Sequence, residues 1–144
     1  MNGKILTLLC LLLICWAGAG AAADYQFVVI VNAANPAATL PRDAVAKIFL
    51  KASRSWGNGA TAKPVDLPVG AATREAFSRT VLQQSAGAID ELWQRQIFSG
   101  RDVPPPRKSS DAEVIQYVAR NPGGIGYVAA GSSLPGNVKK LQIQ

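Results

Sequence analysis

The chain has 144 residues and a net charge of +6, and its composition excludes several classes of function. It contains no histidine, and its two cysteines, Cys10 and Cys15, both lie in an apolar N-terminal segment. The commonest general base, metal ligand and thiol nucleophile are therefore absent from residues 24–144. We expect no enzyme, no catalytic residue, no metal site and no cofactor. The scattered basic residues also argue against a nucleic-acid partner, which would need a dense basic stripe.

The first 23 residues have the pattern of a secretory signal peptide. Lys4 is the only charge before Asp24, and the stretch 5–16 is almost wholly apolar. A membrane-spanning helix needs roughly 20 such residues, so a retained anchor is the weaker alternative. The small residues at 21–23 supply a cleavage site, and we predict cleavage near Ala23/Asp24 and a periplasmic location. Removal of Lys4 lowers the net charge to +5 and leaves one domain, residues 24–144.

The first half of this domain predicts a strand, two helices and a short second strand. Residues 25–31 form a continuous β-branched and aromatic run, which is typical of a strand buried on both faces. Pro41 suits the first position of a helix over roughly 41–51. An Asn-Gly turn over 56–59 separates this helix from a candidate strand at 64–67. A second helix begins near residue 73.

The second half predicts two further helices and two strands. A helix over roughly 88–98 stops at Gly100, and an extended proline connector follows at 103–106. A capping box at Ser110 opens the fourth helix. Residues 125–128 read as a strand and 141–143 as a terminal edge strand. Strands separated by helices indicate a three-layer α/β domain with a mixed sheet flanked by helices.

Three aromatic residues are candidates either for the core or for a ligand cleft. The pattern around Trp93 and Tyr127 places both in the core. Trp56 stands beside the glycine-rich turn, and its position leaves exposure and burial equally open.

Several short motifs follow one another along the chain in a fixed order: Gly70-x-x-Thr73-Arg74-Glu75-x-Phe77, then Phe98-Ser99-Gly100, then Asn121-Pro122-Gly123-Gly124-Ile125-Gly126-Tyr127-Val128. Together they resemble the phosphate-binding protein family of ABC-type transporters, which has the type II periplasmic-binding-protein fold. The resemblance spans residues 25–144. It implies a periplasmic-binding-protein-like single lobe and phosphate or a similar oxyanion as the ligand.

The chain departs from this family in two respects. Transporting members have two lobes that close on the ligand, whereas residues 24–144 correspond to one lobe and its leading strand. The family's binding loop resembles Arg-Ser-Asp-Gly-Ser-Gly-Thr, and residues 67–73 stand in its place here. Of that loop only Gly70 and Thr73 remain, and Arg74 follows directly, as in many members.

By this resemblance the candidate anion-binding residues are Gly70, Ala72, Thr73 and Arg74. At the start of a helix, the Thr73 hydroxyl and free backbone N–H groups attract negative charge, and Arg74 can grip an oxyanion in two places. The alternative is that Thr73 is an ordinary N-cap and Arg74 a solvated residue of the first turn.

Two functions remain open at this stage. One is a solute-binding-like protein that holds phosphate or a similar oxyanion weakly. The other is a periplasmic protein-interaction or sensory adaptor module that keeps the fold without binding a transport ligand. A single lobe also exposes a face that a homodimer or a membrane-protein partner would cover.

Overall fold

The computed structural model describes residues 25–144. The predicted signal peptide, its cleavage site at Ala23/Asp24 and both cysteines lie outside this range. Within residues 25–144, no helix has the length and apolar character needed to cross a membrane.

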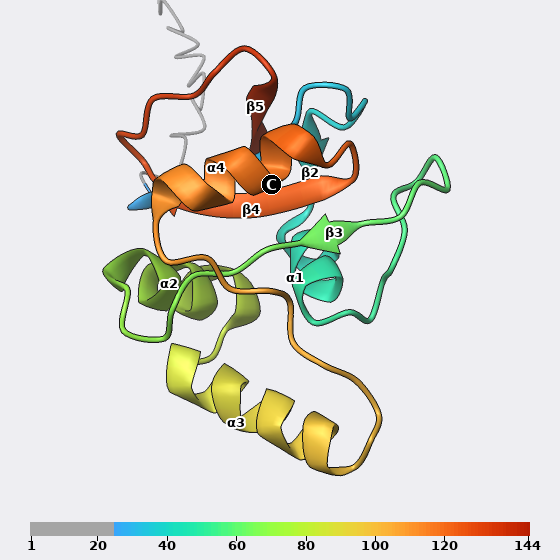
Figure 1. Cartoon of the computed structure of the whole chain (residues 1–144), viewed down its shortest axis with the longest axis vertical. Coiled ribbons are helices and arrows are strands. Elements are labelled where there is room, and N and C mark those ends of the chain that lie inside the picture. The colour runs from blue at the N-terminus through green and yellow to red at the C-terminus, as the bar shows by residue number, and fades with distance from the viewer. Residues whose placement is uncertain (1–24) are drawn as a thin grey trace, which may run out of the picture.

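A five-stranded mixed sheet forms the centre of the molecule, with strand order β2-β5-β1-β4-β3 (Figure 1). The first strand, β1, runs antiparallel to both of its neighbours, and each short outer strand runs parallel to the strand beside it. The mixed sheet predicted from the sequence is thereby confirmed. The strands are β1 (Phe27–Asn32), β2 (Thr39–Leu40), β3 (Lys63–Pro64), β4 (Gly124–Ala129) and β5 (Val138–Ile143).

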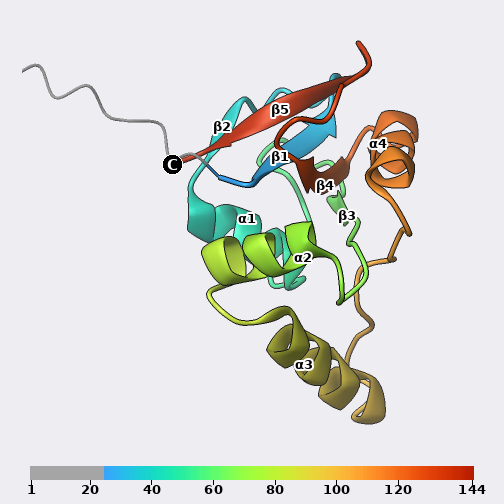
Figure 2. The ribbon, with the colours of Figure 1, turned by 90° about the vertical axis from the view of Figure 1, so that its left-hand side faces the viewer.

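Helices cover both faces of the sheet, so the predicted three-layer α/β arrangement is also confirmed. In Figure 2, α4 lies on one side of β1 and β4, and α1 and α2 lie on the other. The third helix, α3, projects away from the sheet. The helical elements are α1 (Arg42–Phe49), α2 (Ala72–Phe77), the π-helical segment η1 (Ser78–Leu82), α3 (Ala86–Phe98) and α4 (Asp111–Arg120).

The core is built around β1, which is buried on both faces as its apolar run predicts. Aromatic rings from β1, α1, α2 and β4 meet on the side of the sheet that faces α1 and α2. Trp93 and Tyr127 are buried as expected, at 3% and 0% exposure. Trp56 is buried as well, and its indole Nε1 donates to the Gly123 carbonyl at 3.1 Å.

The N-cap predicted at Ser110 is present, but the Glu113 side chain of the predicted capping box reaches the residue before the cap. Ser110 Oγ accepts from the backbone N–H of Glu113 at 3.3 Å, and the Glu113 carboxylate accepts from the N–H of Ser109 at 2.8 Å. The helix predicted over 41–51 is shorter than expected. It begins after Pro41 and ends at Phe49, because Lys51 adopts a left-handed backbone with φ of 56°.

One strand assignment is wrong. The C-terminal strand β5 was expected at the edge of the sheet, but it lies between β1 and β2. The edge strand β2 has two residues, Thr39 and Leu40, which pair with Gln142 and Ile143. Two residues are too few to leave a pattern in the sequence, so the true edge could not be anticipated.

Candidate functional site

The candidate anion-binding residues lie where the chain leaves the sheet and enters α2. The N-cap of α2 is Ala71, so Thr73 is the second helical residue, and the alternative in which Thr73 caps the helix is wrong. Gly70 and Ala72 are exposed, and Thr73 is half-buried. Between Leu67 and Ala72 no side chain carries a hydrogen-bonding group.

Arg74 points into the protein and away from this exposed loop. The residue is 1% exposed, so the alternative in which it is a solvated first-turn residue is wrong. Its Nη1 donates to the Leu67 carbonyl at 2.6 Å, and its Nη2 lies 3.3 Å from Asp66 Oδ2. The structure therefore separates the four candidates: Gly70 lies in the loop, Ala72 and Thr73 open α2, and Arg74 belongs to a buried ion pair.

Asp66 is the centre of this buried pair. Its Oδ1 accepts from the backbone N–H of Leu67 at 2.9 Å and from the Tyr127 hydroxyl. Its backbone pairs with the proline connector, since the Asp66 N–H donates to the Pro106 carbonyl and the Asp66 carbonyl accepts from the Lys108 N–H. Three segments that are distant in sequence are thus held together around Asp66, through its backbone and its carboxylate.

Burial dominates the electrostatics of the pair. Desolvation raises the pKa of Asp66 above its ordinary value of 3.8, and the Arg74 guanidinium opposes that rise only in part. Burial, followed by the neighbouring Asp66 carboxylate, raises the pKa of Tyr127. The Tyr127 hydroxyl is therefore a fixed donor to the carboxylate and is not poised to give up its proton.

The guanidinium retains unused hydrogen-bonding capacity. Although Nη2 of Arg74 is close enough to Asp66 for an ion pair, neither Nε nor Nη2 makes a hydrogen bond to a residue that the structure describes. A buried donor without an acceptor lowers the stability of the folded protein, so Nε and Nη2 weaken this buried arrangement.

Sequence reasoning missed Asp66, although the sequence contained a signal for it. Asp66 lies between Val65 and Leu67 within a predicted strand, and an acid in an apolar run requires a buried partner. The partner Arg74 was already a candidate, but the third member, Tyr127, is 61 residues away and is brought in by β4.

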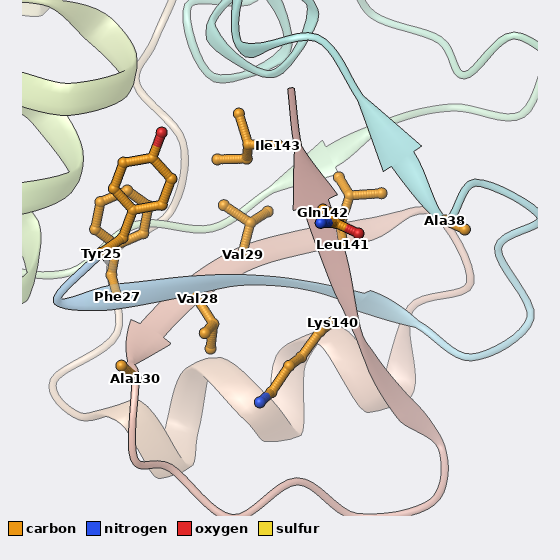
Figure 3. Close-up of a pocket in the computed structure, with 10 residues that line it drawn as sticks. All are labelled: Tyr25, Phe27, Val28, Val29, Ala38, Ala130, Lys140, Leu141, Gln142 and Ile143. Carbon is orange, nitrogen blue, oxygen red and sulfur yellow. The ribbon is translucent and has the colours of Figure 1, made fainter. Parts of the chain in front are cut away.

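A groove with a volume of ≈ 540 Å³ lies at the junction of β1 and β5 (Figure 3). Pairing between the two strands stops at Val29 and Leu141, and beyond that point β5 turns to pair with β2. The part of β1 before Val29 therefore has no neighbouring strand on this side. The groove is lined by Tyr25, Phe27, Val28, Val29, Ala38, Ala130, Lys140, Leu141, Gln142 and Ile143.

This groove is separate from the candidate anion-binding residues, none of which lines it. Its walls are mainly aliphatic and aromatic, with Lys140 as its one charged member. It is suited to apolar contact and lacks the convergent donors that an oxyanion requires.

Comparison with known proteins supports the fold assignment. The PBP superfamily domain matches residues 23–142. No curated protein matches the sequence significantly. An ABC-type phosphate transport receptor from Vibrio cholerae superposes with a TM-score of 0.61 at 19% identity, covering 82% of this chain and 46% of the receptor.

Two further solved structures give the same result. A putative phosphate ABC transporter substrate-binding protein from Clostridium perfringens, with bound phosphate, superposes with a TM-score of 0.64 at 18% identity over 82% of this chain and 44% of that protein. PstS from Borrelia burgdorferi gives 0.59 at 16% identity, with coverages of 83% and 47%. The chain thus spans less than half the length of these proteins and has the fold of a single lobe. It belongs to the PBP superfamily.

Proposed function

We propose that this chain is a periplasmic protein-interaction module, of adaptor or sensory type, that keeps the lobe of a phosphate-binding protein without using it to carry an oxyanion. One observation supports this above all others: Arg74, the only cation among the candidate ligand residues, is buried against Asp66. A cation neutralised inside the core offers little to a ligand at the surface. We assign the chain no catalysis.

The rest of the loop supports the same proposal. The residues from Leu67 to Ala72 offer an incoming anion backbone groups alone, and Thr73 adds one hydroxyl. A few neutral hydrogen bonds must offset several kcal/mol of association cost, so any binding would have a dissociation constant of about a millimolar or weaker. Uptake of a scarce nutrient requires far tighter binding. The proposed partner is therefore a protein, either a second copy of the chain or a membrane protein.

Weak binding of phosphate at residues 70–74 is the second candidate. It is favoured by the unused Nε and Nη2 donors of Arg74 and by family membership, since the relatives above are described as phosphate receptors. For this function the loop would have to open and the guanidinium would have to exchange Asp66 for the ligand.

Calorimetric titration with inorganic phosphate separates the interaction module from a tight oxyanion receptor, and a comparison with Thr73→Ala shows whether any weak binding occurs at this loop. We expect the wild-type protein to bind at about a millimolar or more weakly, or to give no heat. Thr73→Ala is the informative variant because it removes the loop hydroxyl and leaves the buried pair intact. Arg74→Ala is the second variant, with its folding checked by circular dichroism. Micromolar binding that either substitution weakens would overturn the interaction-module proposal in favour of an oxyanion receptor.

A further inference from the structure

The exposed large apolar side chains of the described residues gather at one tip of the molecule. They are Ile97, Phe98 and Val103, which are 49%, 87% and 59% exposed. The first two end α3 and the third follows in the next loop; together they are called the apolar tip. In both overall views α3 forms an extremity of the molecule, away from the sheet (Figures 1 and 2).

The exposure of Ile97 follows from the length of the apolar stripe along α3. Ile89, Trp93 and Ile97 recur every four residues and so share one face of the helix. The body of the protein covers the first two, which are 1% and 3% exposed, but it ends before the last turn. The sequence thus continues an apolar face past the point at which the fold can bury it.

The tip is held in a defined shape. Gly100 has a left-handed φ of 67°, and its N–H donates to the Ile97 carbonyl at 3.0 Å, which closes the end of α3. Asp102 then ties the loop to the body through ion pairs with Lys51 and Arg54. Its carboxylate also accepts from the N–H of Val103 at 2.8 Å. The apolar side chains are therefore presented by an anchored loop.

Two cations flank the apolar tip. Arg95 and Arg101 are exposed, and the side chain of neither makes an ion pair with a described residue. Asp102 is already engaged by Lys51 and Arg54, so it does not offset them. The exposed acid in this part of α3, Glu91, lies one turn back toward the body.

We propose that the apolar tip inserts into the surface of an anionic lipid membrane, with Arg95 and Arg101 on the headgroup phosphates. Shallow insertion depends on buried apolar area together with attraction between cations and anionic lipids, and the tip supplies both. A stable protein interface buries about 800 Å² per partner, which three side chains do not provide. The proposal does not depend on the function proposed above.

Co-sedimentation with vesicles tests this directly, using the purified exported protein. We expect binding to vesicles of phosphatidylglycerol and phosphatidylcholine and weaker binding to phosphatidylcholine alone. Phe98→Ser should lower the partition coefficient about tenfold or more, since it removes a large apolar group from the lipid. Arg95→Gln and Arg101→Gln should each lower it about fivefold, while Lys140→Ala, an exposed cation far from the tip, should leave it unchanged.

A fluorescent variant shows whether the tip itself enters the lipid. Trp56 and Trp93 are buried, so Phe98→Trp adds an exposed reporter at the tip. Its emission should shift to the blue on addition of anionic vesicles, whereas that of the control Asn137→Trp, in an exposed loop before β5, should not. The proposal fails if wild-type protein does not bind the vesicles or if Phe98→Ser binds equally well. It also fails if Phe98→Ser abolishes self-association or capture of a protein while leaving lipid binding intact.

Discussion

The ring of Tyr127 lies flat against the ring of Phe77, with centroids 3.9 Å apart and an interplanar angle of 4°. Phe77 is three residues after Arg74, so both side chains project from the same face of α2. Through Phe77 the helix holds the Tyr127 ring, and through Arg74 it meets the carboxylate to which the Tyr127 hydroxyl donates. One side of α2 is therefore fixed to β4 by a stacked ring pair and to the segment after β3 by a buried ion pair.

The hydroxyl of Tyr127 should contribute measurably to stability. Tyr127→Phe keeps the stacked ring but deprives the buried Asp66 carboxylate of a donor, which should lower the free energy of unfolding by about 1–3 kcal/mol. Urea unfolding measures the change. Tyr117→Phe is the matched control because that hydroxyl has no hydrogen-bond partner among the described residues; it should cost no more than about 0.5 kcal/mol. Equal losses in the two variants would contradict the role given to Tyr127.

Asp66 should make stability depend on pH in an unusual direction. Its pKa in the folded protein is raised above 3.8, so the folded chain holds this proton more tightly than the unfolded chain does. Between the two pKa values, stability therefore falls as the pH rises. The carboxylates with lowered pKa values, Asp43, Glu75 and Asp102, act in the opposite direction.

A comparison with Asp66→Asn isolates the contribution of Asp66 to the pH dependence of stability, because the other three carboxylates are common to both proteins. On acidification from neutral pH toward 3.8, the wild-type protein should gain stability relative to the variant, whose amide does not titrate. Urea midpoints measured across that range provide the test. If the difference in stability between the two proteins stays constant, or changes in the other direction, burial does not raise the pKa of Asp66.

Gly123 should tolerate no side chain. A Cβ placed there would lie 1.9 Å from the Thr61 carbonyl oxygen, which is backbone and cannot move aside cheaply. Gly123→Ala should therefore destabilise the protein by about 1–3 kcal/mol or more. Gly131→Ala serves as the control, since a Cβ there meets nothing within 4 Å. Thermal unfolding of the two variants should differ clearly, and similar midpoints would mean that the loop at Thr61 can relax.

The N-terminal segment should be removed on export. Its short apolar run and the small residues at 21–23 predict cleavage near Ala23/Asp24. Intact-mass spectrometry of the exported protein should give a chain that starts at Asp24, within a residue or two. Recovery of the protein with its leader attached would favour the membrane-anchored alternative.

Much of the fold could be predicted because its signals are local. The apolar run of β1 and the N-cap at Ser110 are each written in a few adjacent residues, and both are present. The order of the strands could not be predicted, because β2 contributes only two residues and its partner in β5 is over a hundred residues away.

In the candidate site, too, the features with a local signal could be predicted and those set by distant residues could not. The motif around Thr73 and Arg74 identified the start of α2, but a motif does not show which way a side chain turns. The direction of Arg74 is set by Asp66, and that of Asp66 partly by Tyr127 in a distant strand. The expectation of anion binding at these residues stays a prediction, which the phosphate titration will test.

The position of β5 has a consequence for how the protein folds. The central strand β1 pairs on one side with β4 and on the other with β5, and Val29 lies opposite Leu141 across the sheet. The residues in these contacts are far apart in sequence. The chain must therefore lose the entropy of closing long loops before the strand pairs can stabilise the sheet. Until residues 138–143 are available, β1 has only one neighbour and β2 has none. The sheet should therefore assemble only after residues 138–143 have been synthesised.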